Sequence, residues 1–208
     1  MRIVAIGDTR TQHRDVKVPD GDVLLFAGDG EFRSAPDLVD FNDWLSTLKH
    51  KHIIAIAGNH DFFCEKHPNE VKQYLTSAIY LRDEGYILPN GTPIWASPMT
   101  QTFMDWAFME TEENLDRYYW SKIPKDTGIL LVHGPAYKHL DIGRPKYGNL
   151  GSKTLAKKIE ELRIPYVIHG HIHGSYGIEK TKDTTYINCS VLDEDYQLVN
   201  DPIVIDVW

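Results

Sequence analysis

Residues 53–61 read Ile-Ile-Ala-Ile-Ala-Gly-Asn-His-Asp, and this stretch contains the two features that decide the fold. Its first five residues form a short apolar run, rich in β-branched side chains, of the kind that forms a strand buried on both faces. The run stops at a glycine, and three polar residues follow it. Four other runs end in the same way: Arg2–Ile6 at Gly7-Asp8, Val23–Ala27 at Gly28-Asp29, Ile129–Val132 at His133-Gly134 and Tyr166–Ile168 at His169-Gly170-His171.

The segments between these runs carry helical patterns. Apolar residues recur at helical spacing in Ser34–Lys49, where Ser34 is a candidate N-cap, and in Ser152–Leu162. Weaker helical patterns cover Pro68–Thr76 and Glu110–Trp120. Strands that alternate with helices predict an α/β fold.

The C-terminal part has a different pattern, because strand-like segments follow one another without helices between them. These segments are Tyr176–Lys180, Thr184–Asn188 and Ile203–Val207, and the Lys182-Asp183 turn predicts a hairpin between the first two. The pattern indicates a second, more antiparallel sheet packed on the first. Since no linker, repeat or low-complexity segment interrupts the chain, we expect one domain over residues 1–208.

Composition restricts the possible partners and the compartment. The chain has 208 residues and a net charge of −8, and a surface this negative repels polyanions, so a nucleic-acid polymer is not expected as a partner. The apolar run after Met1 is too short for a signal peptide or a membrane span. Cys64 and Cys189 are far apart and form no metal-binding pattern. A cytoplasmic protein with reduced thiols and no membrane partner is expected.

The polar residues at the strand ends predict a metal site. In open α/β sheets, ligands bind at the carboxyl ends of the strands, so side chains from different runs are expected to meet there. His171 and His173 alternate along an extended segment and therefore point the same way. Oxygen and imidazole ligands together suit Mn²⁺, Fe²⁺, Zn²⁺ or Ni²⁺. The candidate residues are Asp8, Asp29, Asn59, His60, His133, His171 and His173.

The order of these motifs along the chain resembles that of the calcineurin-like metallophosphoesterases. The resemblance is closest to the branch that contains the MPPED proteins and bacterial class III cyclic-nucleotide phosphodiesterases. Segments 41–45, 94–98, 105–108 and 186–188 support that branch. The resemblance implies a four-layer α/β sandwich, in which two central mixed β-sheets are flanked by helices.

The resemblance also implies a role for each candidate residue. Asp29 bridges two divalent metal ions, for which Mn²⁺ is favoured and Fe, Zn, Ni or Co are alternatives. The first ion is bound by Asp8 and His173, and the second by Asn59, His133 and His171. A metal-bound hydroxide attacks phosphorus, while Asn59 and His60 contact the substrate and His60 is the catalytic acid.

The chain departs from the family pattern in two places, and the first of them affects the first metal site. The first motif of the family usually reads Asp-x-His, whereas this chain has Asp8-Thr9-Arg10. Arginine has no lone pair to offer a metal, so the first site is expected to be weak or empty, and Arg10 becomes a candidate substrate ligand. The second departure is Gly30-Glu31-Phe32 after the bridging aspartate. We also consider His13 as a replacement ligand, although a surface or substrate-side position is favoured for it.

Hydrolysis of small phosphodiesters, including cyclic nucleotides, is the favoured function. One alternative is a phosphomonoesterase or protein phosphatase, and the other is a weakly active nucleotide-binding or scaffold protein, which Arg10 makes plausible. A monomer or a homodimer is expected. His139 and Arg144 are candidates for the substrate mouth. Trp95, Phe103 and Trp106 are expected to pack in the core or a loop, with a nucleobase wall as the alternative.

Overall fold

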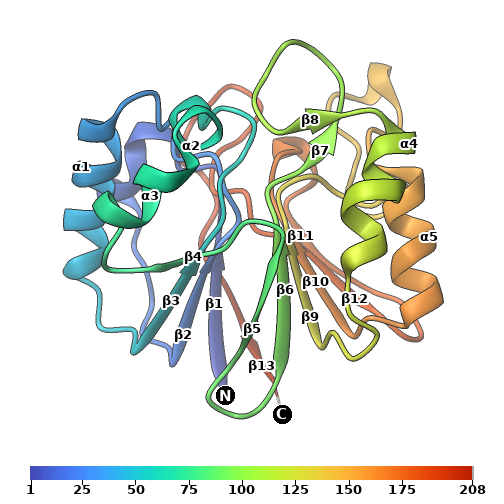
Figure 1. The fold of residues 1–208 in the computed structure, drawn as a ribbon, viewed down its shortest axis with the longest axis horizontal. Coiled ribbons are helices and arrows are strands. Elements are labelled where there is room, and N and C mark those ends of the chain that lie inside the picture. Colours follow the sequence, from blue (N-terminus) through green and yellow to red (C-terminus); the bar gives the residue numbers. More distant parts are fainter. Residues whose placement is uncertain (208) are drawn as a thin grey trace.

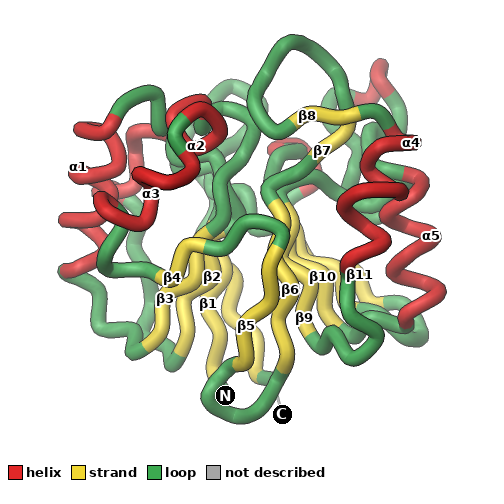
Figure 2. Tube along the Cα trace, viewed as in Figure 1, coloured by secondary structure: helices red, strands yellow, loops and turns green. Residues whose placement is uncertain are grey.

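The computed structural model describes residues 1–207, which form two mixed β-sheets packed face to face with helices on both outer faces (Figure 1). The first sheet has the strand order β13-β1-β2-β3-β4 and the second has the order β11-β12-β10-β9-β6-β5. Helices α1, α2 and α3 cover the first sheet, and α4 and α5 cover the second (Figures 1 and 2). The four-layer α/β sandwich implied by the family resemblance is confirmed.

The elements have the following bounds. The first sheet contains β1 (Arg2–Ile6), β2 (Val23–Phe26), β3 (His52–Ala55), β4 (Ile79–Tyr80) and β13 (Ile203–Asp206). The second contains β5 (Glu84–Ile87), β6 (Pro93–Ser97), β9 (Ile129–Val132), β10 (Tyr166–His169), β11 (Gly177–Lys180) and β12 (Thr185–Asn188). A small two-stranded sheet pairs β7 (Thr100–Gln101) with β8 (Met109–Glu110). The helices are α1 (Ala35–Ser46), α2 (Phe62–Lys66), α3 (Pro68–Tyr74), α4 (Glu112–Asn114) and α5 (Lys153–Leu162).

The central strands are buried on both faces, which explains their continuous apolar runs. In β1, Ile3 and Ala5 belong to the core between the two sheets, which also contains Ile129 and Leu131 of β9. The alternate residues Val4 and Ile6 face the other way, into the core that contains the inner side of α1. Burial of the apolar side chains on both faces of these strands is the main favourable contribution to the stability of such a sandwich.

The expected helices are present with shifted ends. Helix α1 begins after Ser34, which forms a capping box with Asp37, and α5 begins after Ser152, whose side chain accepts a hydrogen bond from the Leu155 N–H. The predicted helix over residues 110–120 is interrupted, because α4 continues as a π-helical turn at 115–119 and a 3₁₀ turn at 120–122. Among residues 1–207, no helix has both the length and the apolar character needed to cross a membrane.

The prediction of a second, more antiparallel sheet in the C-terminal part is partly wrong. The hairpin of β11 and β12 is confirmed, but β12 pairs in parallel with β10 and so extends the sheet that contains β9. Strand β13 leaves this sheet and pairs antiparallel with β1, with Ala5 opposite Ile203. The physical reason is that β1 would otherwise present unpaired backbone groups at a buried edge. A second antiparallel pair, β5–β6, lies at the opposite edge of the second sheet.

Candidate metal centre

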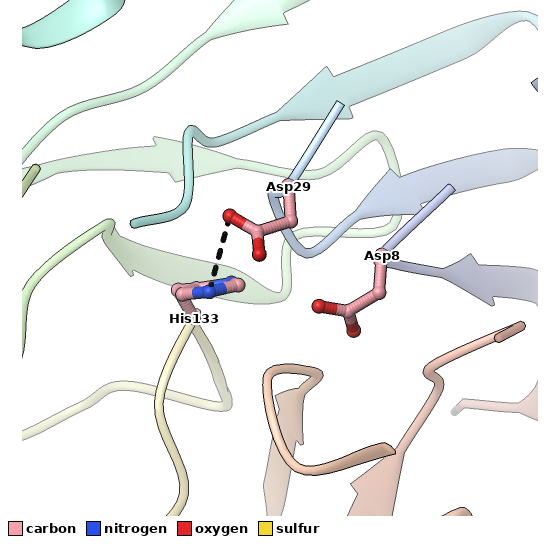
Figure 3. Close-up of side chains that lie close together, drawn as sticks. All are labelled: Asp8, Asp29 and His133. Carbon is pink, nitrogen blue, oxygen red and sulfur yellow. Dashed lines mark ion pairs between the residues drawn. The ribbon is translucent and has the colours of Figure 1, made fainter. Parts of the chain in front are cut away.

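The candidate ligands gather where the carboxyl ends of the central strands of the two sheets meet. Asp8 follows β1 and Asp29 follows β2 in one sheet, while His133 follows β9 in the other. Figure 3 shows these three side chains turned toward one another. Their ligand atoms lie within 4.8 Å of one another, and all three residues are buried. Residues that are distant along the chain therefore form one cluster at the strand ends.

The hydrogen bonds of His133 direct a lone pair into this cluster. Its Nδ1 lies 2.9 Å from the carbonyl of Ala27, to which it donates. In the neutral imidazole this leaves Nε2 as the nitrogen with a lone pair, and Nε2 lies 2.7 Å from Asn59 Oδ1 and 3.4 Å from Asp29 Oδ1. Three acceptor atoms therefore converge, and a bound cation satisfies such a set best. This chemistry fits a divalent metal ion held by Asp29, Asn59 and His133.

His171 and His173 complete the other side of the cluster. The Asp8 carboxylate accepts from the His171 N–H at 2.9 and 3.1 Å, and its Oδ1 lies 3.5 Å from His173 Nε2. The Nδ1 of His173 lies 2.8 Å from the carbonyl of Asp193, which again directs Nε2 inward. Burial and the neighbouring His133 lower the pKa of His171 well below its usual range, so its imidazole stays neutral and able to bind a metal.

The backbone that positions these ligands has strained conformations, and its glycines lie very close to the ligand side chains. Asp8, Asp29 and His171 all have positive φ, between 54° and 67°, in the left-handed region that non-glycine residues rarely adopt. A side chain at Gly58 would overlap Asp29 and His133, and one at Gly170 would overlap Asp8. Such strain typically costs about 1–3 kcal/mol per residue and is concentrated at functional sites.

A pocket of about 390 Å³ opens above the cluster. Its floor includes Asp29, Asn59, His171 and His173. Its walls carry four aromatic side chains: Phe103, Trp106, Tyr147 and Tyr196. Phe103 and Trp106 lie on the loop between β7 and β8, and their rings lie 5.9 Å apart. The pocket thus offers apolar surface around a polar floor, which is the usual composition of a small-molecule site.

Comparison with known proteins identifies the family. The model of the calcineurin-like phosphoesterases matches residues 1–175. The chain belongs to the calcineurin-like phosphoesterases. It is 34% identical over 232 residues to metallophosphoesterase domain-containing protein 1 of Homo sapiens, a match that covers 99% of this chain and 71% of the relative.

Solved structures share the fold of this calcineurin-like phosphoesterase. The protein TT1561 of Thermus thermophilus has a TM-score of 0.64 at 15% identity, covering 90% of this chain and 88% of that one. A dimetal phosphatase from Danio rerio has a TM-score of 0.56 at 11% identity, covering 90% and 86%. Family membership implies that divalent metal ions support the hydrolysis of phosphoric esters, and the converging ligand atoms described above suit such ions.

His60 lies beside the ligand cluster of the phosphoesterase. Its backbone N–H donates to Asp29 Oδ1 at 2.8 Å, and its ring lies 4.7 Å from that of Trp106 at the pocket wall. The ring Nδ1 is 3.9 Å from Glu31. The backbone of His60 therefore orients Asp29, while its imidazole lines the pocket.

Arg10 also lines the pocket. Its guanidinium is 2.5 Å from Glu31 and 3.7 Å from Asp29, and it lies over the ring of Tyr196 at 5.1 Å. His13 is neither a replacement ligand nor a surface or substrate-side residue. It is buried against Phe41 and Trp44 of α1, because its 3₁₀ helix, Arg10–Asp15, packs on that helix.

Of the other residues considered for the pocket, some line its wall and others pack elsewhere in the protein. Arg144 lines the pocket, whereas the ring of His139 stacks on Tyr186 at 3.9 Å. Phe103 and Trp106 lie in the β7–β8 loop and line the pocket, and Phe103 is 65% exposed. Of the expected core or loop packing, the loop position is found for both residues, and the nucleobase wall stays a prediction. Trp95 packs against the core, as expected.

Sequence reasoning gave no role to Asp61, which organises both ligand loops. It is buried, and its carboxylate accepts from the backbone N–H groups of Gly58 (2.7 Å), Phe32 (2.9 Å) and Asp29 (3.0 Å), with a longer contact to Gly30. The carboxylate thereby joins the loop after β2 to the loop after β3. The signal available in the sequence was a charged residue in a glycine-containing turn that directly follows two site residues.

Proposed function

We propose that this calcineurin-like phosphoesterase hydrolyses small phosphodiesters, with cyclic nucleotides among them, and that Mn²⁺ serves it best. The observation that carries the proposal is the convergence of Asp29 Oδ1, Asn59 Oδ1 and His133 Nε2 at the floor of the aromatic pocket. When bound, divalent ions lower the pKa of a water nucleophile and offset the charge of the phosphoryl oxygens.

The residues of the chain have separate tasks in this proposal. Asp29, Asn59, His133 and His171 hold one ion, and Asp8, Asp29 and His173 surround the position of the other. Within residues 1–207, the buried Asn59 Nδ2 has no hydrogen-bond partner, so it is available to donate to a phosphoryl oxygen. The imidazole of His60, at the pocket wall, donates a proton to the departing ester oxygen.

The shape of the pocket and the net charge of the chain support the diester preference. The aromatic residues surround the floor from separate segments, namely the β7–β8 loop and the residues near 147 and 196, so two organic groups on one phosphate both find apolar surface. The net charge of −8 disfavours a polyanionic substrate. The two arginines of the pocket, Arg10 and Arg144, favour the alternative of a monoester dianion.

Two chromogenic esters separate these functions. We expect kcat/KM for bis-p-nitrophenyl phosphate to exceed that for p-nitrophenyl phosphate by about tenfold, which corresponds to roughly 1.4 kcal/mol of transition-state stabilisation. The measurement uses chelator-treated protein titrated with Mn²⁺. A preference for the monoester would identify a phosphomonoesterase. If both esters were hydrolysed only at the background rate and Mn²⁺ did not raise that rate, a binding or scaffold protein would be favoured.

The location and assembly of the protein are also proposals. Cys64 and Cys189 are free and buried, which suits the reduced thiols of the cytoplasm. A monomer or a homodimer is proposed.

A further inference from the structure

The two departures from the family motifs meet in space. Arg10 lies in the loop after β1 and Glu31 in the loop after β2, 21 positions further along the chain. The Arg10 guanidinium donates to the Glu31 carboxylate at 2.5 Å. Both residues have positive φ, 49° and 66°, so each loop has an unusual backbone at the point of contact. The ion pair is therefore accompanied by a particular backbone conformation in both loops.

The pair holds the guanidinium beside Asp29, one of the predicted ligands of the first metal. The side chains of Arg10 and Glu31 are only 14% and 15% exposed, and a second guanidinium nitrogen lies 3.7 Å from the Asp29 carboxylate. Arg33, an exposed residue, forms a second ion pair with Glu31 from the outer side. In the part of the chain that the structure describes, Arg10 Nε is buried without a hydrogen-bond partner. The Nε–H donor of this cation is thus unused.

A guanidinium held in a fixed position repels a divalent cation bound next to it. Arginine stays protonated, so it cannot relieve the repulsion by losing its charge, and it offers no lone pair. The first position retains only Asp8, Asp29 and His173 as protein ligands. Asp8 is already engaged by the His171 N–H and by His173. The second position keeps its full set: Asp29, Asn59, His133 and His171.

We propose that Arg10, positioned by Glu31, replaces the first metal ion with a fixed guanidinium, so that the chain retains one divalent ion and binds a phosphoryl oxygen through Arg10. A guanidinium recognises phosphoryl oxygens by charge-assisted hydrogen bonds, and its unused Nε–H belongs to a residue that lines the pocket. The substrate class stays that of the proposed function, on which this inference rests. Glu31 acts as a positioning residue.

The metal content and the phosphate affinity of variants test this inference. Purified wild-type protein saturated with Mn²⁺ and desalted is expected to carry about one ion per chain by plasma mass spectrometry, with the electron paramagnetic resonance spectrum of an isolated Mn²⁺ ion. Arg10→His supplies an imidazole and removes the charge, so about two ions with a spin-coupled spectrum are expected. In calorimetric titrations without added metal, inorganic phosphate should bind this variant about tenfold more weakly than it binds the wild type, because one charge-assisted contact is lost.

Two further variants separate the charge of Arg10 from the shape of its side chain. Arg10→Lys keeps the charge and loses the planar fork, so it should retain one ion and bind phosphate more weakly than the wild type. Arg33→Gln removes the outer partner of the same Glu31 and should change neither quantity. Thermal melts confirm that each variant is folded.

The outcomes for this inference and for the proposed function are distinct. Two ions of comparable affinity in the wild-type chain would overturn the inference and leave metal-dependent hydrolysis intact. Unchanged metal content and phosphate affinity in Arg10→His would also overturn it. A single retained ion without Mn²⁺-dependent turnover would instead overturn the proposed function.

Discussion

Replacement of His60 by alanine is expected to lower turnover of a diester with a poor leaving group by about 10²–10⁴-fold, while bound metal is retained. The imidazole lines the pocket beside Trp106, and its proposed task is to protonate the departing oxygen. The backbone N–H that donates to Asp29 is unaffected by the substitution. Steady-state kinetics and plasma mass spectrometry on the same preparation measure both quantities.

The leaving group provides the internal control for His60. A p-nitrophenolate departs without protonation, so the loss on bis-p-nitrophenyl phosphate should be much smaller than on an alkyl diester. His67→Ala is a matched control, because His67 is exposed and contacts Glu70 and Phe63 rather than the residues of the pocket. Equal losses on both esters would exclude the general-acid role, and loss of metal would give His60 a different role.

Replacement of Asp61 by alanine is expected to lower the free energy of unfolding by about 4 kcal/mol, since several buried backbone N–H groups lose their acceptor at once. These donors belong to Gly58, Phe32 and Asp29, which lie in two different ligand loops. Urea denaturation in the presence of a chelator measures the effect without a contribution from bound metal.

Asp37→Ala is the matched control for Asp61. Asp37 also accepts backbone hydrogen bonds, from Arg33 and Ser34, but it does so at the partly exposed start of α1. Loss of such a cap typically costs about 1 kcal/mol. If the two variants lost equal stability, the proposed role of Asp61 in joining the ligand loops would be wrong.

The sequence predicted the α/β class and the meeting of the strand ends because both depend on local patterns, whereas the four-layer arrangement was implied by the family resemblance. Continuous apolar runs indicate central strands, and glycine followed by a polar residue marks their carboxyl ends. Asp8, Asp29 and His133 were placed together by this argument, and the structure brings their ligand atoms within 4.8 Å of one another. The metal roles of these residues stay predictions until an ion is bound and observed.

The features that sequence reasoning missed depend on long-range contacts. Strand β13 is a short strand-like segment, as β12 is, but it pairs with β1 of the other sheet, which is distant from it along the chain. The contact between Arg10 and Glu31 requires left-handed backbone in both loops, which neither residue type favours. His13 has a polar side chain, yet it is buried because its helix packs on Phe41 and Trp44.

The position of a bound metal tests the central claim most directly. Anomalous diffraction from crystals soaked in Mn²⁺ locates the ion independently of any activity. We expect the strongest peak at about 2.0–2.2 Å from oxygen and nitrogen atoms of Asp29, Asn59, His133 and His171, which is the usual range for divalent first-row ions such as zinc. A strongest peak elsewhere, or none at this cluster in crystals that bind Mn²⁺, would contradict the assignment of these residues as the metal centre.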